Sequence, residues 1–306
     1  MQKILLTLFA LFWAVTGFAK SNIQDNTFLW KISKEGRPDS YLLGTMHVGP
    51  VGVRLPAAYQ GALDRVERLV VESNEAELHD PRYAADMAKM FLLMADGRTL
   101  NQSLGARRIE ALNRSLSLGN DKLAFDGNSK LKPWAVWLSV QSLFVPKGYS
   151  SEYGIDVQLI KRATESGKTV MALERLEPLH YFQTVPEDKI KRGFDVINRN
   201  PKRFLKQQAQ AIEDYYAGNA LKLWSDLANP NYVLAGTPGR DRAYWQDFLY
   251  NKLLIERNQQ WLPKLIEILP KEPTLVAVGA AHLDGEHGLI RRLRQVGYRV
   301  EPVRTR

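Results

Sequence analysis

Two histidines of this chain follow apolar runs, each three residues after a glycine. Residues 41–49 read YLLGTMHVG and place His47 after Gly44, and residues 274–285 read TLVAVGAAHLDG and place His282 after Gly279. A glycine at the end of a buried strand lets a neighbouring backbone or a substrate come close. Gly-x-x-His is a short pattern, but its return after a second apolar run indicates that both histidines belong to one functional site.

Two other apolar runs stop at a carboxylate. LVV is followed by Glu72, and VMAL is followed by Glu174. In open α/β sheets, ligands bind outside the carboxyl ends of the strands. If the four runs are neighbouring strands of one sheet, two imidazoles and two carboxylates share a single pocket.

Two chemistries suit two histidines and two glutamates. In the first, imidazoles and carboxylates bind a divalent cation such as Zn²⁺, Mn²⁺ or Co²⁺. The metal lowers the pKa of a bound water, and a remaining glutamate acts as general base. In the second, no metal takes part. His47 with a glutamate partner then activates water directly, because an imidazole pKa of about 6.5 suits proton transfer at neutral pH.

The pattern around these residues predicts an α/β fold, with an α+β arrangement as the alternative. Residues 27–33 and 41–46 flank the turn-rich KEGRPDS and predict a β-hairpin. A short apolar run at 68–73 predicts a buried parallel strand, and residues 169–173 predict a further strand. The C-terminal part from residue 274 reads strand–loop–helix–strand, the order already seen in LLGTMH–loop–helix–LVVE. We therefore expect a central sheet built from two related Gly-x-x-His halves.

The chain of 306 residues suits one large domain, predicted over residues 20–306. Helical patterns predict insertions at about 80–150 and 187–262. The first insertion contains LKPWAVWLSVQSLF, whose Trp134 and Trp137 we expect to pack in a core.

The N-terminal residues do not belong to that domain. Lys3, an apolar run from Ile4 to about Val15 and the sequence GFA ending at Ala19 have the layout of a secretory signal peptide cleaved near Ala19. An uncleaved membrane anchor is the alternative, but the run is short for a span of about 20 residues. The chain has no cysteine, which excludes disulfides, thiolate ligands, a cysteine nucleophile and a lipid-bearing cysteine. These features predict a periplasmic or secreted bacterial protein without a stable membrane anchor.

The formal net charge is +9, with the basic residues spread along the chain. No nucleic-acid-binding motif accompanies them, so a solvated surface is the better interpretation than a nucleic-acid partner. The expected partner is a peptide or small-molecule substrate.

The chain resembles the TraB/GumN family, which includes the Tiki proteases and is distantly related to the erythromycin esterases. The resemblance covers nearly the whole chain after the signal peptide and is closest to the bacterial GumN-like branch. It runs through LLGTMHVG, LPAAYQGALDRVERLVVE, KPWAVW, GIDVQLIKRATESGKTVMALE, ERNQQW and VAVGAAHLDGEHGLIRRLRQVGYRV.

The resemblance implies an α/β core and a site built on His47, His282 and Glu72. It maps the second family glutamate onto Glu174 and the family arginine onto Arg257. Tiki members are described as metal-dependent proteases, whereas erythromycin esterases are thought to use a histidine base without metal.

Two functions are therefore expected. The first is an exported, metal-dependent hydrolase of a peptide or ester bond. In it, the metal or its water is held by His47, Glu72 and His282, Glu174 assists as base or second ligand, and Arg257 stabilises developing negative charge. The second is a non-catalytic protein that binds a peptide or another ligand in the same pocket.

Overall fold

The computed structural model describes residues 24–73, 85–86, 89–90, 96–119, 123–175 and 177–304. The predicted signal peptide lies outside this part of the chain. Segments 80–84, 87–88, 91–95 and 120–122 of the first predicted insertion lie outside it as well.

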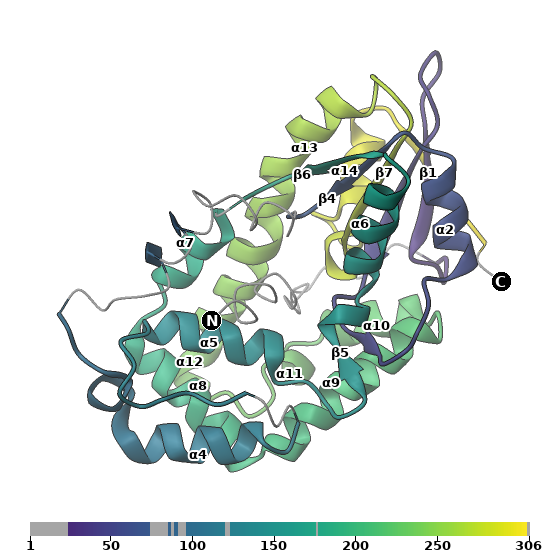
Figure 1. Cartoon of the computed structure of the whole chain (residues 1–306). Helices are drawn as coiled ribbons and strands as arrows, with labels where there is room; N and C mark the ends of the chain where they lie inside the picture. The colour runs from purple at the N-terminus through teal and green to yellow at the C-terminus, as the bar shows by residue number, and fades with distance from the viewer. Residues whose placement is uncertain are drawn as a thin grey trace.

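A mixed six-stranded sheet forms the upper half of the molecule in Figure 1. Its strands, in the order in which they lie side by side, are β6 (Thr169–Ala172), β4 (Arg68–Val71), β7 (Thr274–Gly279), β2 (Ser40–Thr45), β1 (Leu29–Ser33) and β8 (Arg299–Pro302). The first four run parallel, β1 is antiparallel to β2, and β8 is antiparallel to β1. The predicted α/β class and the N-terminal hairpin are confirmed. A separate two-stranded pair joins β3 (Gly49–Pro50) to β5 (Tyr149–Ser150).

Two strand–helix–strand units share the element order that the two Gly-x-x-His segments predict. The first is β2, α2 (Ala57–Asp64) and β4, and the second is β7, the 3₁₀ turn η5 (Ala280–His282), α14 (Leu289–Gln295) and β8. Their crossovers run in opposite directions along the sheet. Because such crossovers are nearly always right-handed, their helices cover opposite faces. In Figure 1, α2 lies beside α6 (Ile155–Glu165) on one side and α14 beside α13 (Arg257–Ile268) on the other.

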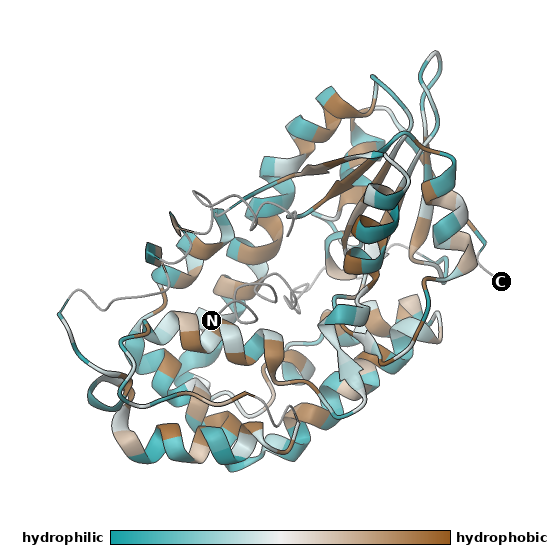
Figure 2. Ribbon diagram, in the orientation of Figure 1, coloured by the Kyte–Doolittle hydropathy of each residue, from teal (hydrophilic) through white to brown (hydrophobic). Residues whose placement is uncertain are grey.

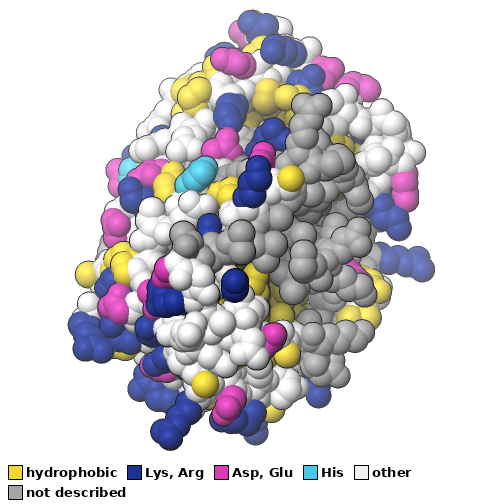
Figure 3. All heavy atoms as spheres, turned by 60° about the vertical axis from the view of Figure 1, so that its left-hand side comes forward, with side chains coloured by type: hydrophobic (Ala, Val, Ile, Leu, Met, Phe, Trp, Pro, Cys, Tyr) yellow, Lys and Arg dark blue, Asp and Glu magenta, His cyan; other side chains and the backbone are white. Residues whose placement is uncertain are grey.

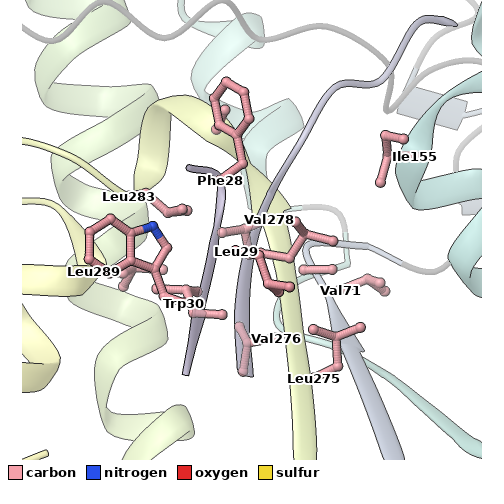
Figure 4. Packing of buried hydrophobic residues seen from close by; sticks show 14 of the residues in the cluster. Phe28, Leu29, Trp30, Val71, Ile155, Leu275, Val276, Val278, Leu283 and Leu289 are labelled. Atoms are coloured by element: carbon pink, nitrogen blue, oxygen red, sulfur yellow. The ribbon is translucent and has the colours of Figure 1, made fainter. Parts of the chain in front are cut away.

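The sheet core is apolar on both faces. All six residues of β7 are buried, as expected for a central strand covered on both sides. Figure 4 shows Leu275, Val276 and Val278 of this strand packed beside Leu29 and Val71 from its neighbours. In Figure 2 the strands are correspondingly the brownest part of the upper half.

Helices from both predicted insertions form the lower half of the molecule in Figure 1. Helix α4 (Ala106–Leu116) and α5 (Pro133–Leu143) come from the first and contact α8 (Glu187–Arg199) of the second. The two insertions therefore share a second hydrophobic cluster, separate from that of the sheet. Further helical elements of this half and of the connection back to the sheet, within the described residues, are π-helix η2 (Asn101–Gly105), η3 (Ser151–Tyr153), α7 (Glu177–Gln183), α9 (Pro201–Tyr216), α10 (Ala220–Leu227), α11 (Pro230–Val233), α12 (Gly239–Asp247) and π-helix η4 (Phe248–Glu256).

The surface carries charges of both signs. On the face shown in Figure 3, Lys and Arg side chains are spread widely, with Asp and Glu between them. Within the described residues, no helix is long and apolar enough to cross a membrane.

Candidate functional site

The strands that are followed in the sequence by an ionisable residue end at one edge of the sheet. In the strand register, Val71 of β4 lies beside Ala172 of β6 and Ala277 of β7, so β4 and β6 end at the same level and β7 runs two residues further, to Gly279. The side chains that follow these strands and β2 gather there, together with the first residue of α13. The structure thus brings together all five predicted site residues, which are His47, Glu72, Glu174, Arg257 and His282.

Arg257 lies at the centre of the cluster and binds both glutamates. Its Nε donates to Glu174 Oε1 and Oε2 at 3.0 and 3.1 Å, and its Nη2 donates to Glu174 Oε1 and to Glu72 Oε2. The guanidinium lies 4.7 Å from the ring centroid of Trp261, whose Nε1 donates to Glu174 Oε2 at 3.0 Å. The Arg257 side chain is only 3% exposed. It is therefore the counter-ion of two carboxylates, in a position where a charged group is stable only when paired.

His282 is held as a neutral imidazole by its neighbours. Asn258 Nδ2 donates to the carbonyl oxygens of His282 and His287 at 3.1 and 2.9 Å, so Asn258 Oδ1 is left as an acceptor. His282 Nδ1 lies 2.7 Å from that oxygen and carries the proton. Its Nε2 accepts from Arg257 Nη1 at 3.2 Å. Burial and the charge of Arg257 lower the pKa of His282 to about 3.

The contacts of Gly279 explain why the second Gly-x-x-His motif has a glycine at this edge of the sheet. Its backbone N–H donates to Glu72 Oε1 at 2.6 Å. A Cβ at this position would lie 3.1 Å from Glu72 Oε1 and 3.3 Å from His47 Nε2. A side chain here would press on both groups, so glycine allows the carboxylate and the imidazole to converge.

The other motif glycine, Gly44, allows the two strand–helix–strand units to pack closely. A Cβ on Gly44 would lie 3.0 Å from the Cα of Ala280, the first residue of η5. Tyr215 of α9 also donates its hydroxyl to the carbonyl of Gly44 at 2.6 Å. The absence of a side chain lets the two motif segments touch.

His47 faces this cluster from the end of β2. Its Nδ1 lies 3.1 Å from Asp156 Oδ1, an ion-pair distance whose alignment falls short of a well-directed hydrogen bond. Asp156 stands in the first turn of α6, and this helix start is docked on the loop of His47. Ile155 N donates to Met46 O at 2.9 Å, and a Cβ on Gly154 would lie 2.5 Å from His47 O. The loop and the helix therefore fix the imidazole beside the carboxylate.

The charges around His47 change its protonation. Burial alone would lower the pKa of His47, but the carboxylates of Asp156 and Glu72 outweigh it and raise the pKa from 6.5 to about 9. Burial likewise opposes ionisation of Glu72, yet Arg257 and the histidines hold the pKa of that carboxyl well below its usual range. Burial raises the pKa of Glu174 against the pull of Arg257. At neutral pH, His47 is thus an imidazolium between carboxylates, and His282 is a neutral acceptor.

Access to the cluster differs from residue to residue. The side chains of His47, Glu72 and Asp156 are 10%, 12% and 17% exposed, whereas those of Glu174 and His282 are each 2% exposed. The more open side of the cluster is therefore that of Asp156, Glu72 and His47.

Sequence reasoning missed three residues of the cluster: Asp156, Asn258 and Trp261. Asp156 follows Gly154 at the start of a helix, where an acidic residue is ordinary and gives no signal of its own. Asn258 and Trp261 stand in the quoted ERNQQW. Trp261 follows Arg257 by four residues, a helical spacing that places both on one face and was the available signal, whereas Asn258 is the next residue after Arg257 and has no such signal.

The metal set predicted from the sequence, which is His47, Glu72 and His282, does not have the geometry of a metal site. Within the described residues, no group of three or more His, Asp or Glu side chains could hold a metal ion. His282 Nε2 and Glu72 Oε2 are engaged by Arg257, and Glu72 Oε1 is engaged by the backbone of Gly279. The position between these donors already has a cation in the guanidinium, so the residues as arranged do not fit a divalent metal.

Comparison with known proteins assigns the chain to a family. The model of the TraB/PrgY/gumN family matches residues 28–302, which include every residue of the cluster. The chain belongs to this family. No solved structure matches it.

Among known relatives, YbaP of Shigella flexneri is 25% identical over 281 residues, which cover 89% of this chain and 95% of YbaP. A protein of Amphimedon queenslandica named metalloprotease TIKI homolog is 26% identical over 325 residues, which cover 92% of this chain and 62% of that protein. Metalloprotease TIKI2 of Danio rerio is 24% identical, with 90% and 61% covered. This chain therefore matches less than two thirds of each TIKI protein.

Proposed function

We propose that this protein is a hydrolase that cleaves a peptide or ester bond, with His47 as the general base that activates water. The observation that carries the proposal is the placement of His47. One ring nitrogen lies beside Asp156, while the other faces Glu72 and the bare backbone of Gly279. A base held by a carboxylate on one side and open to the reacting atom on the other is the recurring arrangement of hydrolytic sites. The TIKI relatives, which are named metalloproteases, support a hydrolase.

Each residue then has a role that follows from its contacts. In the fraction of molecules whose His47 is neutral, water bound between His47 Nε2 and Glu72 Oε1 gives its proton to His47 as it attacks the carbonyl carbon, and the imidazolium returns the proton to the leaving group. The carboxylates of Asp156 and Glu72 stabilise the imidazolium in between. Arg257, which is buried and bonded to both glutamates, acts as a positioning residue that fixes Glu72.

Metal dependence, as the sequence resemblance implies, stays a prediction. No step above passes through a metal, because the donors that would hold it are bonded to Arg257 and Gly279. Metal analysis of purified protein beside His47→Ala and His282→Ala decides the point. If the purified protein contains about one equivalent of metal and both substitutions abolish it, the proposed hydrolase is metal-dependent.

The proposed function is tested by incubating the protein with a diverse peptide library and a set of aryl esters, with and without added Mn²⁺, Co²⁺ or Zn²⁺. We expect new peptide termini or free alcohol by mass spectrometry, and a loss of at least about 100-fold in rate for His47→Ala. His180→Ala is the matched control, because His180 is exposed on α7 and outside the cluster. Peptides that bind but stay intact in every arm would instead support the non-catalytic binding protein.

A further inference from the structure

The helical half of the molecule contains a cavity of about 180 Å³ that is separate from the strand-edge cluster. Helices α5, α8, α9 and α12 and the connection after α11 line it, and Figure 1 shows these elements together in the lower half. A cavity of about 150 Å³ lined by apolar side chains takes up benzene. This cavity is therefore large enough for one substituted aromatic ring.

Its walls are aromatic and firmly supported. Trp137 and Trp245 stack with ring centroids 5.2 Å apart, and Phe248 meets Trp245 edge-on at 5.7 Å. The connection after α11 is tied down, because Gln207 Nε2 donates to Tyr232 O at 2.6 Å and Arg242 Nη1 donates to Leu234 O at 3.0 Å. Trp137 was expected to be core packing, and it is also a wall of this space.

Gln208 of α9 is the unusual residue of the lining. It is only 6% exposed, and neither its amide oxygen nor its amide nitrogen has a hydrogen-bond partner among the described residues. Buried amides are nearly always bonded. An acceptor and a donor, both unused and side by side next to an apolar cavity, are the complement of another amide.

The charges of the cavity lining favour a neutral ligand over an anion. Asp241 is the charged residue of the described lining, and its carboxylate is paired with Lys189 Nζ at 3.1 Å and Arg192 Nη2 at 2.8 Å. No lysine or arginine belongs to the described lining, so nothing there would balance a carboxylate or phosphate.

We propose that this cavity binds a small neutral amide with an aromatic body, its amide group paired with Gln208 and its ring against Trp137 and Trp245. The site is independent of the proposed hydrolytic centre. It lies at the start of the continuous helix that runs through η4 to Arg257, since Phe248 is both a wall of the cavity and the first residue of η4.

Phenylacetamide is the probe, and quenching or shift of tryptophan fluorescence in the full chain is the readout. We expect saturable binding of phenylacetamide, at least tenfold weaker binding of phenylacetate because of its charge, and binding of propylbenzene through its ring alone. No saturable response to phenylacetamide, or equal affinity for phenylacetate, would overturn the proposal.

Gln208→Leu separates a ligand group from a structural one. This variant should bind phenylacetamide at least tenfold more weakly and propylbenzene as well as before, while Gln210→Leu, an exposed position on the same helix, should change neither. The melting temperature of Gln208→Leu should not fall, because no described residue loses a hydrogen bond to Gln208. Unchanged phenylacetamide affinity, or a fall of several degrees in melting temperature, would show that Gln208 already has a partner.

As a second test, Ala235→Leu should narrow the cavity and weaken the binding of phenylacetamide and propylbenzene. Unchanged binding would place both probes elsewhere.

Discussion

At the scale of single residues, the pKa of His47 is the property on which the proposed catalysis depends. With a pKa of about 9, roughly one His47 in a hundred is neutral and able to accept a proton at pH 7. The rate should therefore rise with pH, reach half of its plateau near pH 9 and level off above it.

Asp156→Asn removes the carboxylate that contributes most to this rise. The pKa of His47 should fall, so the rising limb of kcat/KM should move to lower pH by at least one unit, with a lower plateau because the imidazolium loses a stabilising charge. The pH profiles of wild type and variant check this. A rising limb that stays in place would show that Asp156 does not act on the base.

Arg257→Met should destabilise the fold strongly, because it leaves the buried carboxylates of Glu72 and Glu174 without their counter-ion. We expect a loss of about 3–5 kcal/mol in the free energy of unfolding, measured with urea. Adding Glu174→Gln to this variant should restore part of the loss. Arg299→Met, which breaks an exposed ion pair with Glu301, is the control and should change little. Equal losses in the two single variants would contradict the buried network.

At the scale of elements, the site depends on strands that end at one edge of the sheet and on bare backbone between them. Gly279→Ala would place a methyl group 3.1 Å from Glu72 Oε1 and 3.3 Å from His47 Nε2. We expect a loss of about tenfold or more in kcat with a modest loss of stability, since the displaced groups lie at the more open side of the cluster.

Gly61→Ala is the matched control for this substitution. Gly61 lies in α2, where a Cβ would meet nothing within 4 Å. There the change should stabilise the protein by about 0.5–1 kcal/mol and leave kcat unchanged. If both alanines act alike on kcat, the space at Gly279 is not what the site requires.

At the scale of the whole molecule, the two motif histidines act in opposite directions on stability. The pKa of His47 is raised in the fold, so its contribution is fully present below pH 6.5 and is lost as pH rises toward about 9. The pKa of His282 is lowered to about 3, so the fold resists its protonation and loses stability as pH falls below 6.5. These two groups together favour greatest stability near pH 6.5.

Urea unfolding across pH 4–10 measures this balance. His47→Gln should flatten the decline between pH 6.5 and 9 and leave the acid side unchanged. A decline of the same steepness in this variant would mean that other groups cause it.

Much of the sheet and part of the site could be predicted from the sequence, because the relevant signals are local. An apolar run that stops at His47, Glu72, Glu174 or His282 marks both a strand and the side chain at its end, and the parallel topology brings those ends together. The partners of these residues could not be predicted in the same way. Asp156 has the sequence context of an ordinary helix start, and its closeness to His47 comes from a contact between segments more than a hundred residues apart.

The packing of the helical half could not be predicted from the sequence either. Helical periodicity predicts the helices of the two insertions, but not that α4 and α5 pack on α8 or that a cavity remains among them. Such packing depends on how side chains from distant segments fill space, and Gln208 has no local signal that distinguishes it from neighbouring glutamines in KQQAQ.

The most direct test of the proposed site is the titration of His47 by NMR in protein with isotope-labelled histidine, with His47→Gln used to assign its signal. The strand-edge cluster predicts that His47 titrates near pH 9 and that its midpoint falls in Asp156→Asn. A midpoint at or below 6.5 that Asp156→Asn leaves unchanged would contradict a base held between two carboxylates.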